Sequence, residues 1–256
     1  MKVSVIKVIM AIAVVSGALV SQAQVESTTT SALSVRAGYY SEKQTFMDWE
    51  MNYTAPFVGL GLDLKRPLNG PLYLLGQGSV DVAYGTYSEP GIGTEDFDQD
   101  LIRVKLQGAL AYDIALGQLK LDPFAGLGYR YWKRGSGDGM TPYIETWTAA
   151  YAVLGVRGEI KLADRALFGQ IDGQIPISEQ ISMGSTLGTD YTFSSQDKSS
   201  MVNVEFGIKG DRLSLSLFGE FYSYSKDQSF EGDSMGLGLG DTVEASTVGV
   251  RFGGSM

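Results

Sequence analysis

The sequence lacks cysteine and histidine altogether, and it lacks an apolar run long enough to form a membrane-spanning helix. Without cysteine we expect no disulfide, no thiolate metal site and no lipid-anchored amino terminus. Without histidine the chain has no copy of the side chain that most often acts as a general base near neutral pH. A spanning helix needs about 20 consecutive apolar residues, and the apolar runs here are shorter than that.

The chain begins with a segment, MKVSVIKVIMAIAVVSGALVSQAQ, that has the order of regions typical of an export signal. Two lysines precede an apolar run, and Ser21 and Ala23 have the spacing of a signal-peptidase site. We expect residues 1–23 to be a signal peptide, residues 24–32 a short flexible segment, and residues 33–256 a single domain. The alternative, a first buried helix, does not explain the order of charged, apolar and small residues.

Hydrophobicity in the rest of the chain has a period of two residues. In LIRVKLQGALAYDI, residues 101–114, the even positions are mostly large and apolar, whereas Arg103, Lys105 and Asp113 all occupy odd positions. A helix would scatter these charges around its circumference, whereas a strand sends alternate side chains to opposite faces. The pattern recurs and predicts an all-β fold of about ten strands, with eight as the alternative, over residues 33–40, 58–64, 72–84, 101–114, 119–130, 154–162, 167–177, 202–209, 212–221 and 247–252.

The predicted strands are joined alternately by short and long links. The short links are KRPLNGP, LGQ, ADR and GD, and the other five run through about 11 to 22 polar and glycine-rich residues. Outer-membrane β-barrels have this asymmetry, with tight periplasmic turns, long outer loops, an even strand number and an apolar outer face opposite a polar interior.

On these features the whole mature chain resembles the bacterial outer-membrane β-barrel superfamily. The resemblance implies a closed, antiparallel, up-and-down transmembrane β-barrel in the outer membrane of a Gram-negative bacterium. A soluble β-sandwich also has alternating strands, but its outer face would not carry so nearly complete a set of charges. Members of the superfamily commonly end the last strand on an aromatic residue, and that role falls to Phe252, through which the barrel-assembly machinery would recognise the chain.

Aromatic residues gather toward the ends of the predicted strands that face the long links. Amphipathic rings belong at a membrane interface, where barrels carry aromatic girdles. We therefore expect an interfacial girdle made of Tyr39, Tyr40, Tyr84, Tyr87, Tyr129, Tyr131, Trp132, Trp147, Tyr151, Tyr222 and Tyr224.

The alternation also assigns charged residues of both signs to the inner face. A ten-stranded barrel is close in size to those that are filled by their own side chains, so these charges should pair and plug the lumen. Two-residue turns at Leu116-Gly117 and Asp164-Arg165 would place Asp113 opposite Lys120 and Arg157 opposite Asp172. The predicted lumen charge network contains Arg103, Lys105, Asp113, Lys120, Arg157, Glu159, Asp172, Glu205, Glu220 and Arg251.

Negative charge predominates in the predicted long links, and this bears on partners. The run EDFDQD, residues 95–100, has the opening spacing of a calcium loop, but Leu101 replaces the glycine and Gln107 the closing glutamate. A solvated loop and a divalent-ion bridge to anionic lipopolysaccharide both remain open for this run. Acidic loops argue against nucleic acid as a partner. We expect contact with outer-membrane lipid and lipopolysaccharide, no cofactor and no dedicated metal site, and we favour a monomer.

Three classes of function remain, in a definite order. The first is a non-enzymatic closed barrel with a structural, adhesin-like or surface-receptor role. The second is a narrow, porin-like diffusion channel. The third is a hydrolase that works without histidine. The outer-membrane enzymes that this chain resembles depend on a histidine base, and this sequence contains none. A pair of carboxylates or a serine with a lysine could act instead, but no spacing in the sequence singles such residues out.

Overall fold

The computed structural model describes residues 29–46, 49–68, 70–88, 97–135, 143–185, 190–195, 199–225 and 242–255. All regular structure within these ranges is β-strand. Across the same ranges, no helix is both long and apolar enough to cross a membrane. The predicted signal peptide and the first two residues of the acidic run, Glu95 and Asp96, lie outside the described residues.

Twelve strands are present in the described part of the chain. Their bounds are β1 Thr30–Phe46, β2 Trp49–Pro67, β3 Leu72–Ser88, β4 Phe97–Tyr112, β5 Ile114–Leu116, β6 Leu119–Gly135, β7 Tyr143–Leu162, β8 Arg165–Ser185, β9 Asp190–Ser195, β10 Ser200–Lys209, β11 Leu213–Ser225 and β12 Thr242–Ser255.

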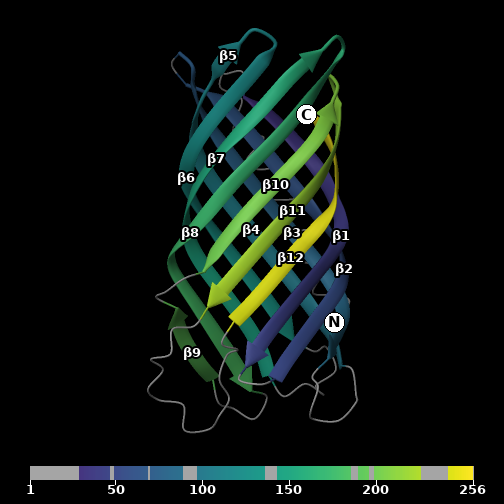
Figure 1. Cartoon of the computed structure of the whole chain (residues 1–256), viewed down its shortest axis with the longest axis vertical. Coiled ribbons are helices and arrows are strands. Elements are labelled where there is room, and N and C mark those ends of the chain that lie inside the picture. Colours follow the sequence, from purple (N-terminus) through teal and green to yellow (C-terminus); the bar gives the residue numbers. More distant parts are fainter. Residues whose placement is uncertain are drawn as a thin grey trace.

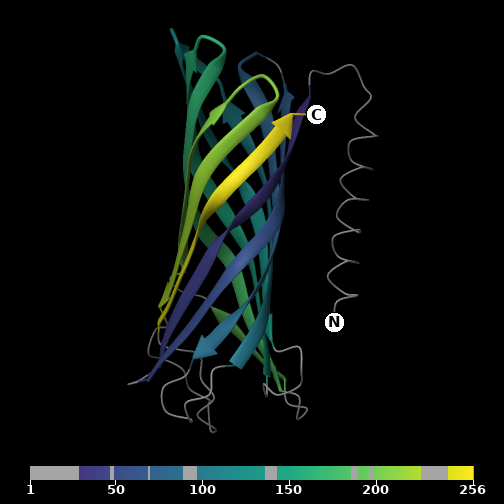
Figure 2. The same cartoon turned by 90° about the vertical axis from the view of Figure 1, so that its right-hand side faces the viewer.

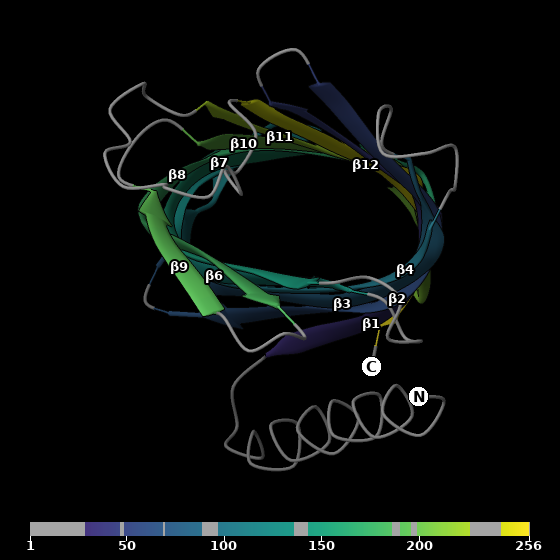
Figure 3. The same cartoon turned by 90° about the horizontal axis from the view of Figure 1, so that it is seen from below.

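Ten of these described strands close into one antiparallel barrel, in which each strand pairs with its neighbours in the chain. β12 pairs with β1, and β8 pairs with β10 beyond the short β9, so the ring has no free edge. β5 prolongs the line of β4 against β6, and β9 adds to the loop-side end of β8. Figure 3 shows the ring along its axis, and Figure 1 shows the strands inclined to that axis. The predicted closed ten-strand barrel is confirmed.

The short turns all lie at one end of the barrel, together with the end of β12 (Figures 1 and 2). Two of them differ from the prediction. Leu116 pairs with Leu119 and Leu162 pairs with Arg165, so each two-residue turn is displaced by one position. The physical reason is the positive φ that such a turn requires at its first central residue. Gly117 meets it with φ 65°, and Ala163 adopts φ 41°.

The strands extend further toward the long links than the sequence predicted. Residues 41–57 were expected to be a link, yet β1 and β2 stay paired as far as Phe46 and Trp49. β7 and β8 have 20 and 21 residues, about twice what a barrel strand needs to span a bilayer. The loop-side part of the barrel is therefore a continuation of the wall rather than a set of loops.

The two faces of the wall have the polarity that the alternation predicts. Leu154 is 66 % exposed on the outer face, whereas Gln107 is 8 % exposed on the inner face. Along the middle and the short-turn side of the wall, the exposed outer residues are mostly large and apolar. They include Val35, Val58, Leu110, Leu127, Ile171, Ile175, Val202, Phe206, Leu215, Leu217, Val250 and Phe252.

The predicted aromatic girdle is only partly correct. Tyr39, Tyr84 and Tyr129 are about half exposed on the outer face. Tyr131, two residues beyond Tyr129, lies on the same face and is partly exposed. The other predicted members with described side chains occupy inward positions of their strands, because alternate residues of a strand face opposite sides. The inward, buried members are Tyr40, Trp132, Trp147, Tyr151, Tyr222 and Tyr224. The side chain of Tyr87 lies outside what the structure describes.

Candidate functional site in the barrel lumen

The middle of the lumen holds a buried cluster of ion pairs centred on Glu220 of β11. Its carboxylate lies 3.1 Å from Arg36, 3.4 Å from Arg103 and 3.5 Å from Lys105. Asp81 of β3 is the second acid of the cluster, 2.7 Å from Arg103 and 3.6 Å from Arg36. Three cations around two carboxylates offset much of the cost of burying charge here.

Contacts of Arg103 cross the lumen rather than follow the wall. The residue lies on β4, and its guanidinium donates to the Thr247 hydroxyl of β12 as well as pairing with Glu220 of β11. The ring places β4 and these two strands on different sides of the barrel. Arg103 therefore ties opposite walls together through the interior.

Nearer the short turns, Arg251 organises a second cluster. It pairs with Asp63 of β2 and lies 3.4 Å from Glu205 of β10. Its Nε donates to the Ser34 hydroxyl at 2.8 Å, and Ser216 donates to Glu205 at 2.6 Å. Strands from both sides of the closing β1–β12 pair thus meet at one guanidinium.

At the short-turn end itself, the predicted network residues form two more pairs. Lys120 pairs with Asp113 and lies 3.8 Å from Asp122. Lys209 of β10 and Glu159 of β7 lie 2.5 Å apart across β8. These pairs are more exposed to solvent than those in the middle of the lumen.

The predicted pair of Arg157 and Asp172 does not form. With the turn displaced, Arg157 lies opposite Gln170 and donates to its Oε1 at 2.8 Å. Asp172 lies opposite Gly155. Its carboxylate accepts hydrogen bonds from the amides of Gln170, Gln174 and Asn203, at 3.0, 3.4 and 2.6 Å respectively. Gln170 therefore stands between the two charges that the sequence placed together.

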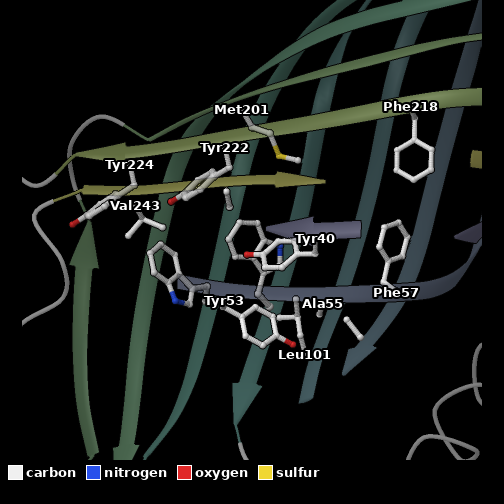
Figure 4. Close-up of a cluster of buried hydrophobic side chains, with 14 residues drawn as sticks. Tyr40, Tyr53, Ala55, Phe57, Leu101, Met201, Phe218, Tyr222, Tyr224 and Val243 are labelled. Carbon is white, nitrogen blue, oxygen red and sulfur yellow. The ribbon is translucent and has the colours of Figure 1, made fainter. Parts of the chain in front are cut away.

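The loop-side half of the lumen is filled by an aromatic layer that the sequence did not predict. It consists of Tyr40, Phe57, Trp132, Trp147, Phe218 and Tyr222, all buried. In Figure 4 the rings of Tyr40 and Phe57 point inward from one side, and those of Phe218 and Tyr222 point inward from the other. The ring centroids of Trp132 and Tyr222 are 5.0 Å apart, and those of Phe57 and Phe218 are 6.1 Å apart. These are contact distances for edge-to-face pairs.

Buried charges are set among these rings. Arg134 of β6 reaches Glu42 of β1 at 2.7 Å and also pairs with Glu145 of β7. Arg130 lies 2.7 Å from Glu179, with its guanidinium over the Tyr222 ring at 4.5 Å. All three acids fall in segments that the sequence assigned to the acidic long links. They lie on strands instead, with exposed fractions of 6 % or less.

Between the Glu220 and Arg251 clusters lies a polar cavity of about 70 Å³. Its lining includes Lys105, Ser79, Asn203 and Gln170. The side-chain oxygen of Asn203 is buried without a hydrogen-bond partner in the structure. Such a cavity, with polar walls and an unsatisfied acceptor, has the character of a site for a few water molecules.

The described residues contain no group of three or more acidic side chains that could hold a metal ion. Of the calcium-like run, Asp96 and the Asp98 side chain lie outside the described part, and Asp100 lies on β4. The lumen clusters instead combine each buried carboxylate with arginine, lysine or amide donors. Chemically, this arrangement fixes charges in place and joins opposite walls.

Comparison with solved structures shows which known proteins share this architecture. The outer membrane protease OmpT from Escherichia coli superposes with a TM-score of 0.57 at 13 % identity, over 91 % of this chain and 98 % of that one. The chain has the fold of a bacterial outer-membrane β-barrel. The likeness of this chain to OmpT concerns the fold alone, because the identity is low.

Other solved outer-membrane proteins match the barrel more loosely. A major outer membrane protein from Thermus thermophilus has 13 % identity and a TM-score of 0.38, over 88 % of this chain and 99 % of that one. OprG from Pseudomonas aeruginosa has 10 % identity and a TM-score of 0.37, over 89 % and 97 %. No protein-family model and no curated protein matches the chain.

Proposed function

We propose that this protein is a non-enzymatic integral barrel of the outer membrane, closed along its lumen, which holds its long links at the cell surface. Its role would be structural, adhesin-like or that of a surface receptor. Export would depend on the predicted signal peptide, residues 1–23. The proposal places the protein in a Gram-negative envelope, in contact with outer-membrane lipid and lipopolysaccharide.

The observation that carries the proposal is the filling of the lumen by contacts between opposite walls. The Trp132–Tyr222 contact, the Arg134–Glu42 pair and the Arg103–Glu220 pair each join strands that are not neighbours in the ring. They lie at successive levels of the barrel, so they support a plugged interior at more than one depth. A closed interior directs function to the outer surface.

A hydrolase has the least support among the three candidate functions. OmpT is a protease by its name, but this chain has no histidine to act as a base. Serine with lysine is an alternative nucleophile and base, and Ser79 does lie opposite Lys105 beside the polar cavity. However, Lys105 already faces Glu220, and the aromatic layer stands between this pair and the long links.

The polar cavity is the one observation that favours a narrow diffusion channel, because it lies in the middle of the lumen and has charged walls. Its small volume argues against a continuous path.

Recording from the folded protein in a planar lipid bilayer separates the two functions. We expect no steady conductance. Regular ohmic steps from barrels shown to be folded by heat-modifiable gel mobility would refute the closed lumen and favour the channel.

Assembly and oligomeric state belong to the same proposal. Phe252 lies on the outer face of β12, the strand that closes the barrel against β1. This position suits the proposed recognition of the last strand by the barrel-assembly machinery. We favour a monomer, because the ring is completed within one chain.

A further inference from the structure

Glycines open a groove in the outer face of the barrel where β2, β3, β4 and β6 run side by side. The strand register places Leu64, Gly76, Gly108 and Leu127 in one row across the wall. The next row toward the long links contains Leu62, Gly78, Leu106 and Tyr129. Two adjacent glycines in the first row and one in the second leave bare backbone between leucine walls.

The resulting groove has a volume of about 430 Å³ and is lined mainly by leucine, glycine and Tyr129. A Cβ atom added at Gly108 would meet nothing within 4 Å. At Gly76 the nearest atom would be the Leu64 Cβ, at 3.4 Å. At Gly78, in the second row, an added Cβ would meet the Leu106 Cδ2 at 3.2 Å. The floor is therefore open space in the row of Gly76 and Gly108, and no charged residue lines the groove.

A single positive charge stands at one end of this apolar groove. The outer-face residues of β2 are Leu62, Leu64 and then Arg66, which is exposed near the short-turn end of the strand. No ion pair of Arg66 occurs within the described part of the chain. Arginine is the side chain best suited to bind a phosphate group by paired hydrogen bonds.

We propose that the groove binds one acyl chain of a phospholipid of the periplasmic leaflet, with the lipid phosphate held by Arg66. This rests on the proposed membrane location, in which the outer face meets hydrocarbon and the short turns face the periplasm. The uncharged groove lies on the part of the wall that would face the bilayer interior, where an acyl chain fits. Arg66 lies at its short-turn end, where the headgroup of that lipid would reach the membrane interface. The charge selects a lipid with an anionic headgroup.

The test uses the full-length folded protein in detergent micelles and counts retained phosphatidylglycerol by native mass spectrometry. Gly108→Leu fills the floor of the groove. Gly173→Leu is the matched control, since Gly173 also lies on the outer face with nothing within 4 Å of an added Cβ, but between Leu154 and Val202. We expect wild type and Gly173→Leu to retain one lipid, and Gly108→Leu to bind it about tenfold more weakly.

The headgroup half of the proposal has its own pair of variants. Arg66→Gln should reduce phosphatidylglycerol binding about tenfold and abolish its preference over phosphatidylcholine, whereas Arg66→Lys should keep part of that preference. Arg165→Gln is the control, because Arg165 is an exposed arginine at the same end of the barrel and outside the Leu62–Leu64–Arg66 column.

Three outcomes would overturn the proposal. Equal lipid retention by Gly108→Leu and Gly173→Leu would show that the groove holds no chain. Equal losses in Arg66→Gln and Arg165→Gln would remove the phosphate site. A wild-type dimer that Gly108→Leu converts to a monomer would make the groove an interface between two copies. Failure of the folded wild type to insert into lipid vesicles would instead refute the proposed membrane location, so the two failures are distinguishable.

Discussion

Arg134 neutralises two carboxylates, Glu42 and Glu145, that would otherwise be buried without a cation. Glu42 also accepts hydrogen bonds from Tyr40 and from Gln44, and Glu145 accepts one from the Trp147 indole at 2.5 Å. Removing one member of a buried ion pair is strongly destabilising, because the remaining charge stays out of water.

We therefore expect Arg134→Met to lower the free energy of unfolding by about 3 to 5 kcal/mol, measured by urea unfolding of protein refolded into lipid vesicles. Lys43→Met is the matched control. Lys43 pairs with Glu50 at 2.9 Å, but both side chains are about half exposed, so the loss should be small. Equal losses in the two variants would mean that the Arg134 cluster is not buried in the folded protein.

At the residue scale, the sequence predicts which side chains face inward better than it predicts their partners. Alternation fixes the face of every residue in a strand, and the ten predicted network residues lie on the inner wall or at its short-turn end. Partners depend on register, and a turn displaced by one position moves the opposing residue by two. Arg157 accordingly meets Gln170 instead of Asp172. The prediction paired residues by opposite charge. Gln170 is neutral, so charge alone provided no reason to expect it as the partner of Arg157.

At the scale of the elements, the turn between β7 and β8 carries strain. Ala163 is the described non-glycine residue with a positive φ, 41°. This left-handed conformation costs an alanine about 1 kcal/mol or more, whereas glycine adopts it freely. At the equivalent turn position between β5 and β6, Gly117 has a φ of 65°.

We expect Ala163→Gly to stabilise the barrel by about 0.5 to 1 kcal/mol, since relief of strain exceeds the added entropy of the unfolded chain. Urea unfolding in vesicles measures the change. Gly117→Ala should have the opposite sign, because it introduces the same strain. A destabilised Ala163→Gly variant would show that the turn does not have the backbone conformation described.

The number of strands could be predicted from the sequence, but their extent could not. The prediction followed apolar residues on the outer face. Toward the long links this polarity inverts, since Trp132 and Arg134 are buried inside while Lys133 is exposed outside. Thr146 and Thr148 likewise flank the buried Trp147. These strand ends have an aromatic inner face and a polar outer face. A prediction that looks for apolar residues on the outer face therefore mistakes them for loops.

At the scale of the whole molecule, the barrel has two parts along its axis that differ in the polarity of the outer face and in the filling of the lumen. In one, an apolar outer face surrounds a lumen of ion pairs and amides around Glu220 and Arg251. In the other, on the loop side, the wall is polar outside and is held by the aromatic layer inside. The apolar outer face of the first part suits contact with a bilayer, and the polar outer face of the second suits contact with water. The sequence indicates this division only once strand direction and the inverted polarity are known together.

The assignment of one face to lipid and the other to a paired interior is central to the proposed function, and one pair of variants tests it directly. Leu154→Arg puts a cation on the outer face midway along β7, where barrels lose about 2 to 4 kcal/mol at the bilayer midplane. Gln107→Arg adds the same charge to the inner face, where Gln107 bonds to Gln77 at 3.2 Å and Gln77 bonds to the Asp63 carboxylate at 3.1 Å. A carboxylate near the new cation should make this second change less costly.

Reversible urea unfolding of both variants, refolded into lipid vesicles, is the measurement. We predict a clearly larger loss of unfolding free energy for Leu154→Arg than for Gln107→Arg. Equal losses, or the larger loss at position 107, would contradict the placement of the outer face in lipid and would remove the membrane from the function proposed for this barrel.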